Sequence, residues 1–130
     1  MHSAWHPKPG ECFLIDSGPV GKHLFVLVLE TKEGNQHQVI SVPVCTIRNP
    51  DRIDESCIIN PGEHPFIKEQ SFIEYRNARV DPIGHLLERV RERTFILQQP
   101  ASLDLLQKIK GGLGISKFVK RYIRDLFSAH

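Results

Sequence analysis

The sequence has 130 residues and a formal net charge of +2, from 17 Lys and Arg against 15 Asp and Glu, so we expect a single domain, residues 1–130, that buries its own core. Its hydrophobic content of 40% and charged content of 25% are ordinary for a globular protein. No apolar run approaches the roughly 20 residues that span a bilayer, and the first residues, MHSAWHPKPGE, lack the apolar core of a signal peptide. These features argue against a membrane-spanning or secreted protein, and we expect a cytoplasmic one.

The first two thirds of the chain are predicted to consist mainly of short strands. Apolar runs rich in branched and aromatic residues, bounded by turn residues, indicate strands; they are Cys12–Ile15, His23–Glu30, His37–Val44, Ser56–Asn60 and, more weakly, Asn77–Val80. Residues 1–9 read as an extended lead-in, and Glu33-Gly34-Asn35 is a hairpin signal. Pro43 favours an edge position or a strand end, and Glu69–Tyr75 is predicted as one or two helical turns.

The last third changes to helical spacing. Pro82–Arg93 is predicted as a helix with Asp81 as its N-cap, and a short strand follows at Thr94–Gln98. Residues 100–130 are predicted as helices. The first is capped by Ser102 and ends at Gly111-Gly112, and the second covers Ser116–Phe127. Strands with tight turns followed by helices predict an α+β domain, and a small, strongly bent antiparallel barrel with C-terminal helices packed on it fits best.

The two halves of the chain differ in charge. Residues 1–65 contain five Lys and Arg and eight Asp and Glu, whereas residues 66–130 contain twelve and seven. An anionic partner is therefore expected at the second half, although a solvated basic face has the same composition.

Metal and cofactor motifs are not found in the sequence. The three cysteines, Cys12, Cys45 and Cys57, lack CxxC spacing and lie in or beside apolar runs, so we interpret them as buried thiols in a reducing compartment. The phosphate-loop, dinucleotide-binding, zinc-protease and hydrolase motifs do not occur. We therefore predict no cofactor and no metal.

The polar segment Pro61–Arg79, PGEHPFIKEQSFIEYRNAR, is the strongest candidate site. Cleavage of RNA without a metal needs a base for the 2′-hydroxyl, an acid for the 5′-oxygen and cations on the phosphoryl oxygens. His64 follows a Pro-Gly turn and is expected to be exposed, as a proton-transfer residue. The other candidates in this segment are cations, a hydroxyl and an aromatic ring: Lys68, Ser71, Tyr75, Arg76 and Arg79.

Each of these residues also has an ordinary structural interpretation. His64 fits a surface loop, and Tyr75 fits a half-buried core position as well as an RNA-stacking one. Arg76 and Arg79 fit pairing with Glu69, Glu74 or Asp81 as well as bidentate binding of a phosphate.

The order of motifs resembles that of the PemK/MazF-like toxins. GECFLID, a turn, GKHLFVLVLE and then VISVPVCT are similar to the family's opening strands, and SFIEYRNARVDPIGHLLERV is similar to its Ser-led segment. The resemblance covers residues 10–110. It implies an SH3-like barrel, usually a homodimer, which cuts single-stranded RNA without a metal and has an antitoxin partner.

The resemblance also maps residue by residue onto this chain. The family's catalytic arginine follows the glycine of the second-strand turn, where this chain has Gly21 followed by Lys22 and His23. The family's threonine after the third strand maps onto Thr46.

We therefore carry two functional hypotheses from the sequence. The first is a toxin-like endoribonuclease with proton transfer by His64 and His23, phosphate stabilisation by Arg76 and Lys22, and positioning by Thr46 and Ser71. Lys68, Tyr75 and Arg79 would bind the RNA. The alternative is a non-catalytic barrel that binds RNA or a protein partner, since the family's arginine is replaced. A regulatory subunit whose C-terminal helices dock on a larger partner is a third interpretation.

Overall fold

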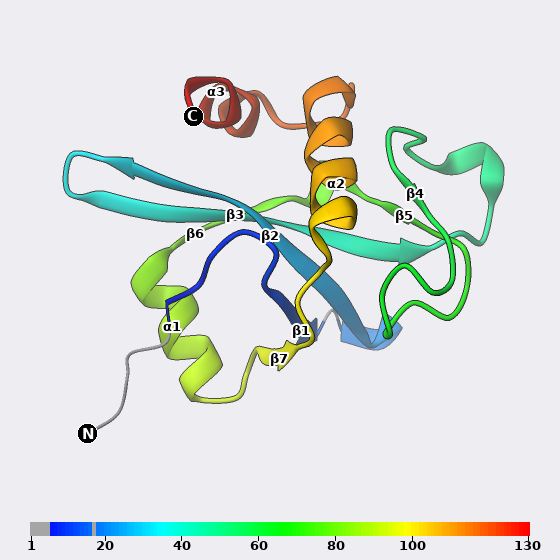
Figure 1. The fold of residues 1–130 in the computed structure, drawn as a ribbon, viewed down its shortest axis with the longest axis horizontal. Helices are drawn as coiled ribbons and strands as arrows, with labels where there is room; N and C mark the ends of the chain where they lie inside the picture. The colour runs from blue at the N-terminus through cyan, green and yellow to red at the C-terminus, as the bar shows by residue number, and fades with distance from the viewer. Residues whose placement is uncertain (1–5, 17) are drawn as a thin grey trace.

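One bent antiparallel sheet organises the molecule in the computed structural model, which describes residues 6–16 and 18–130 (Figure 1). Its strands run in the order β4-β5-β3-β2-β1-β7, and β6 also pairs with β3. The strands are β1 (Cys12–Asp16), β2 (Lys22–Glu33), β3 (Gln36–Thr46), β4 (Ile58–Ile59), β5 (Ser71–Ile73), β6 (Arg79–Pro82) and β7 (Ile96–Gln98). The predicted α+β class is confirmed, but the sheet is not closed into a barrel, because β4 and β7 are its two edges.

In the described part of the chain, three α-helices complete the fold: α1 (Ile83–Arg91), α2 (Leu103–Ile115) and α3 (Arg121–Ala129). Short 3-10 helices lie at η1 (Gly18–Val20), η2 (Pro50–Arg52) and η3 (Tyr75–Asn77). Among the residues that the structure describes, no helix has the length and apolar character needed to cross a membrane.

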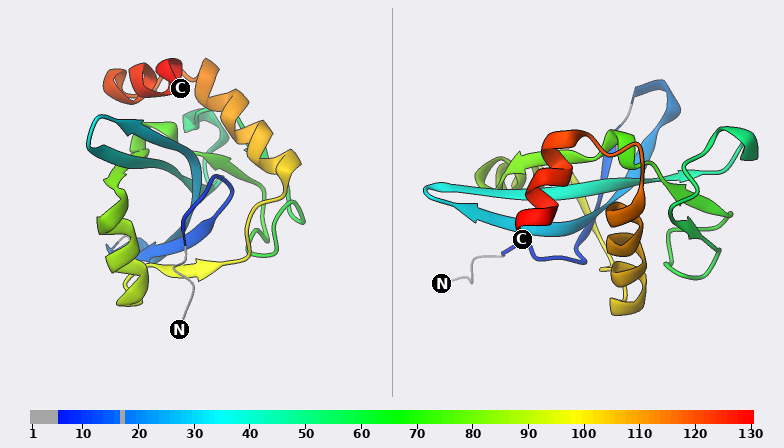
Figure 2. Two further views of the ribbon diagram at one scale, coloured as in Figure 1. Left: turned by 60° about the vertical axis from the view of Figure 1, so that its left-hand side comes forward. Right: turned by 90° about the horizontal axis from the view of Figure 1, so that it is seen from above.

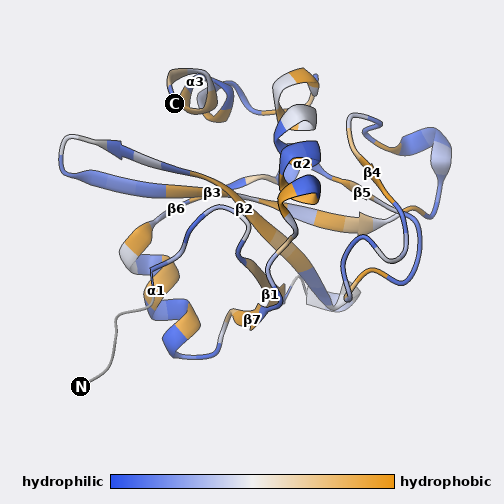
Figure 3. Ribbon diagram, viewed as in Figure 1, coloured by the Kyte–Doolittle hydropathy of each residue, from blue (hydrophilic) through white to orange (hydrophobic). Residues whose placement is uncertain are grey.

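The long β2–β3 ribbon is the backbone of the sheet. Gly34-Asn35 forms the predicted hairpin turn between the two strands, and the central residues of β2 are buried on both faces. Figure 3 shows the apolar residues in the central part of this ribbon and a hydrophilic hairpin end.

The edge position predicted for Pro43 is wrong, because β3 pairs on both sides. The Pro43 carbonyl accepts the Glu74 N–H at 3.1 Å, and a strand residue directs its N and its C=O to the same side. The nitrogen of Pro43, which carries no hydrogen, therefore points to the same side, toward Glu74 and η3. Pro43 lies between the residues of β3 that pair with β6 and those that pair with β5. At that point the ladder has no partner strand, so a proline costs no ladder hydrogen bond.

Two apolar cores lie on opposite faces of the sheet. Phe13, Phe25, Leu27, Leu86 and Phe95 form part of the core under α1. The larger core lies under α2 and α3, and Figure 2 shows these two helices and α1 on opposite sides of the strands.

Four predictions for elements of the second half are wrong. Glu69–Tyr75 is not helical; β5 pairs Ser71 with Thr46, and η3 follows. Asp81 does not cap α1, whose N-cap is Pro82 without a side-chain bond. The capping role of Ser102 is confirmed, since it accepts the Leu105 N–H at 3.1 Å.

The remaining two corrections concern the C-terminal helices. α2 continues through Gly111 and Gly112 to Ile115, and α3 begins at Arg121 rather than at Ser116. Ser116 is buried and its hydroxyl donates to Asp54 at 2.6 Å, so it joins the loop before α3 to the loop before β4.

Candidate functional site

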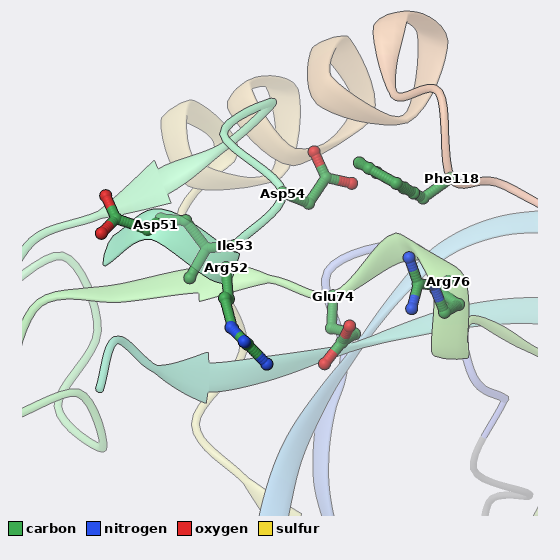
Figure 4. A pocket seen from close by; sticks show the side chains of 7 residues that line it. All are labelled: Asp51, Arg52, Ile53, Asp54, Glu74, Arg76 and Phe118. Carbon is green, nitrogen blue, oxygen red and sulfur yellow. The ribbon is translucent and has the colours of Figure 1, made fainter. Parts of the chain in front are cut away.

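A pocket of about 300 Å³ collects charged side chains from three separate segments (Figure 4). It is lined by Asp51, Arg52, Ile53, Asp54, Glu74, Arg76 and Phe118. These residues come from the η2 region, from the β5–η3 junction and from the loop that precedes α3. We call it the arginine pocket, because two guanidinium groups are its fixed positive charges.

Arg76 is held in this pocket by an aromatic ring and not by a carboxylate. Its guanidinium carbon lies 5.0 Å from the centroid of the Phe118 ring, which is 46% exposed. Such a cation–π contact orients the side chain without neutralising its charge. Among the described residues, neither Arg76 nor Arg52 has a carboxylate oxygen within 4.0 Å of its side-chain nitrogens. Both guanidinium groups are therefore available to an anion, to which Arg can bind bidentately.

Asp54 holds the pocket together and does not face a ligand. It is buried and accepts hydrogen bonds from the Ser56 N–H at 3.0 Å and from the Ser116 hydroxyl at 2.6 Å. The Ser116 oxygen in turn accepts the Phe118 N–H at 3.1 Å. This chain of bonds fixes Phe118, and hence the ring on which Arg76 stacks.

Glu74 is the half-exposed carboxylate of the pocket, and its backbone is fixed by the bond from its N–H to Pro43. Its charge acts on a neighbouring thiol. Burial and, after it, the Glu74 carboxylate raise the pKa of Cys45 to about 11. The Glu74 carboxylate shares the pocket with two guanidinium groups, and a carboxylate beside a bound phosphate can act as a general base.

Tyr75 anchors η3 from the core side, so the core interpretation of this residue holds. Its side chain is 0% exposed, and its hydroxyl donates to the Ile109 carbonyl of α2 at 2.7 Å. Burial, followed by the nearby Cys57 thiol, raises the pKa of the Tyr75 hydroxyl. A ring enclosed in this way cannot stack on an RNA base, and instead fixes the position of Arg76.

Arg79 is withdrawn from ligand binding by an ion pair. Its Nε and one terminal nitrogen donate to the two oxygens of Asp81 at 3.1 and 3.0 Å, and its guanidinium lies over the Phe95 ring at 5.2 Å. The pairing alternative for this residue is therefore confirmed.

The predicted exposure of His64 is wrong. The side chain is only 3% exposed. Its Nε2–H donates to the Gln99 carbonyl at 2.6 Å, and its Nδ1 accepts the Phe66 N–H at 3.0 Å. Both ring nitrogens are thus used to join the 61–70 loop to the residues before α2. This geometry gives His64 a structural role.

Three other predicted residues meet in a second, smaller pocket. Thr46, Lys68 and Ser71 line a space of about 210 Å³ together with Val44, Phe66, Ile67 and Glu69. Thr46 and Ser71 are register partners across β3 and β5. The Ser71 hydroxyl already donates to the Glu69 carbonyl at 2.8 Å.

Lys22 and His23 lie at the start of β2, where they pair with Asp16 and Ile15 of β1. In the strand order, β3 separates them from β5 and η3. The structure therefore does not place them among the residues that line the arginine pocket.

Sequence reasoning found Arg76 but missed Arg52, Glu74 and Phe118. Arg52 and Phe118 were not among the sequence candidates, and Glu74 was considered only as an ion-pair partner of the arginines. No local pattern pointed to this set, because the three segments that carry it meet only in the folded chain.

No protein-family model matches this chain, and no curated protein matches it. The assignment of a function therefore depends on the geometry of the pockets and on the sequence resemblance.

Proposed function

We propose that this chain is a metal-independent endoribonuclease that cleaves single-stranded RNA at the arginine pocket. The observation that carries the proposal is the meeting of one half-exposed carboxylate, Glu74, with the guanidinium groups of Arg52 and Arg76, neither of which forms an ion pair among the described residues. Glu74 accepts the proton of the ribose 2′-hydroxyl. Arg52 and Arg76 hold the phosphoryl oxygens on which charge develops, and solvent protonates the leaving 5′-oxygen.

The exposed ring of Phe118 supports a single-stranded substrate. Unpaired bases stack on aromatic side chains, and such stacking is worth about 1–3 kcal/mol per base. The basic residues Lys117, Lys120 and Arg121, which are exposed at the start of α3, add charge that attracts the RNA backbone.

The proposal also includes the fold and partners that the resemblance implies. We propose that the open, bent sheet is of the SH3-like kind, that the chain acts as a homodimer, and that an antitoxin protein inhibits it. An RNA target also supports the cytoplasmic location expected from the sequence.

The test is incubation of the full chain with a mixed single-stranded RNA in the presence of EDTA, with the 3′ ends of the products characterised. We expect EDTA-resistant cuts that leave a 2′,3′-cyclic phosphate, because the 2′-oxygen is the nucleophile. Glu74→Gln should abolish the cuts. Glu69→Gln is the matched control, because Glu69 is a carboxylate of the second pocket. Loss of cleavage in Glu69→Gln alone would move the site to that pocket, and cleavage abolished by EDTA would contradict the proposal.

A second candidate is the non-catalytic RNA-binding module. It is favoured by the burial of His64 and by the absence of histidine among the described residues that line the arginine pocket. Retained RNA binding by the wild-type chain, without any cleavage and with weaker binding in an Arg76→Ala variant, would establish this candidate in place of the enzyme.

A further inference from the structure

Two histidines and a glutamate converge near the hairpin end of the β2–β3 ribbon, which Figure 3 shows as hydrophilic, and none of them lines the arginine pocket. His6 lies in the segment before β1, Glu30 in β2 and His37 in β3. One ligand atom from each of the three lies within 4.8 Å of the others. The described residues contain no other group of three or more His, Cys, Asp or Glu side chains with this geometry.

The three side chains are aimed at one point. The His6 Nε2 lies 2.8 Å from Oε2 of Glu30, and the His37 Nε2 contacts the same oxygen. The centroids of the two imidazole rings are 5.7 Å apart, and the ring planes are tilted by 37°. Two Nε2 atoms and one carboxylate oxygen are thus gathered around a common centre.

The strand geometry explains why Glu30 and His37 share a face. In the β2–β3 register Glu30 is opposite Val39, and His37 is opposite Lys32. Residues two apart along a strand point to the same face, so Glu30 and His37 are diagonal neighbours on one side of the ribbon. Hydrogen-bonded strands fix these two groups, and His6 adds a third from a separate part of the chain.

We propose that His6, Glu30 and His37 form a binding site for a divalent transition-metal ion of the zinc class. Zinc binds imidazole nitrogen and carboxylate oxygen at about 2.0–2.2 Å, so tetrahedral ligand atoms lie about 3.4 Å apart. The observed cluster reaches that spacing with small side-chain movements. Imidazole donors favour zinc, nickel, copper or iron over magnesium and calcium, which prefer oxygen ligands.

The accessibility of the ligand groups agrees with this role. The Glu30 side chain is 21% exposed and the His37 side chain 25% exposed, so the ribbon partly shields both from solvent. Solvent completes the coordination, because His6 is exposed and leaves one side of the centre open to water.

The bound ion would join the segment before β1 to the β2–β3 ribbon. This inference goes beyond the proposed function and does not depend on it, because none of the three residues lines the arginine pocket. Cleavage of RNA in EDTA is compatible with a metal that stabilises the fold and takes no part in the reaction.

The experiment is calorimetric titration of the metal-stripped full chain with zinc chloride, together with the visible absorption spectrum of the cobalt(II) form. We expect uptake of one ion per chain and the intense absorption bands of tetrahedral cobalt. Glu30→Gln, which keeps the shape of the side chain, should weaken binding at least about tenfold, the effect that even outer-shell changes produce. His37→Ala should do the same.

Two control variants separate this site from other histidines. His85→Ala removes an exposed histidine that also lies near a carboxylate, Asp81, at 3.7 Å but has no third ligand. His2→Ala removes the histidine closest to the N-terminus. Both should bind zinc as the wild type does. Equal binding by the wild type and Glu30→Gln, or the absence of saturable uptake by the wild type, would overturn the proposal and leave a hydrogen-bonded cluster only.

Discussion

The arginine pocket and the neighbouring strand β6 use the same residue type in opposite ways. Arg76 in η3 and Arg79 in β6 are three positions apart, and from the sequence both fit either phosphate binding or pairing with a carboxylate. Arg79 is neutralised by Asp81 and covered by the rings of Phe25 and Phe95, whereas Arg76 stacks on Phe118 and keeps its charge free for an anion. The comparison teaches that the nearest carboxylate, and not the arginine itself, decides which charge is available for binding.

The largest expected difference between the two arginines is in activity. Arg76→Ala should lower RNA cleavage by about 100-fold or more, as the loss of a single oxyanion-stabilising group does, with little change in stability. Arg79→Ala should destabilise the fold and leave cleavage by the remaining folded protein near the wild-type rate. Rate measurements on RNA, with unfolding curves for each variant, test this.

Arg91→Ala is the matched control for charge, because Arg91 is an exposed arginine of α1 that pairs with Glu88. It removes one positive charge and should preserve cleavage. An equal loss in Arg91→Ala and Arg76→Ala would mean that general charge, and not the pocket, drives RNA recognition.

The second prediction concerns the support beneath Arg76. A Cβ at Gly112 would lie 2.9 Å from Cζ of Tyr75 and 3.0 Å from Cβ of Cys57. Gly112→Ala should therefore lower the free energy of unfolding by about 1–3 kcal/mol, the usual cost of overpacking a core. Urea unfolding followed by circular dichroism measures it.

Gly111→Ala, at the adjacent position, should instead raise the free energy of unfolding. No atom lies within 4 Å of a Cβ placed at Gly111, and alanine in a helix interior is favoured over glycine by roughly 0.5–1 kcal/mol. Equal destabilisation by the two substitutions would show that Tyr75 does not pack against α2 in this way.

The third prediction compares the paired carboxylate with the unpaired one. Asp81→Asn removes the charged partner of Arg79 and should cost about 1–2 kcal/mol, less than for a fully buried pair because the Arg79 side chain is 34% exposed. Glu74→Gln has no ion pair to lose among the described residues and should stay within about 0.5 kcal/mol of the wild type. Thermal unfolding of both variants at one pH measures the two losses of stability. Similar losses would contradict the difference expected between the paired and the unpaired carboxylate.

The smallest effect is on the Cys45 thiol. Burial and, after it, the Glu74 charge together raise its pKa to about 11, so Glu74→Gln should lower the pKa of Cys45 and increase the fraction of reactive thiolate. Alkylation by iodoacetamide, followed for the Cys45 peptide across pH 7–10, should be modestly faster in the variant. Cys12, whose pKa is raised to about 12 by burial, is the internal reference. An unchanged rate at Cys45 would mean that the Glu74 charge is neutralised.

Much of the fold could be predicted from local pattern. β1, β2 and β3 follow from apolar runs between turn residues, and the Glu33-Gly34-Asn35 signal gave the correct hairpin. The helical spacing of residues 82–93 and the Ser102 cap also gave correct elements. The segments that failed have weak local patterns and strong tertiary contacts, such as β5, whose three residues are a strand because β3 and β4 pair with it.

Less of the candidate site could be predicted. Arg76 was identified as a phosphate-binding candidate, but His64 was expected at the surface and is buried, with both ring nitrogens bonded to backbone groups of Gln99 and Phe66. A histidine after a Pro-Gly turn has the same local sequence whether its loop folds inward or outward. Burial of this kind depends on Gln99, which is 35 residues away.

By itself, the sequence determined the composition, the strand and helix periodicities and the inventory of cations, because these properties depend on neighbours along the chain. Only the tertiary structure decided which charges are paired and which are free. Phe118 reaches Arg76 from a distant loop, and His6 reaches Glu30 and His37 across the ribbon. Electrostatic and coordination chemistry act over a few ångströms in space, so these functional groups are defined by the packing of segments that are far apart in the chain.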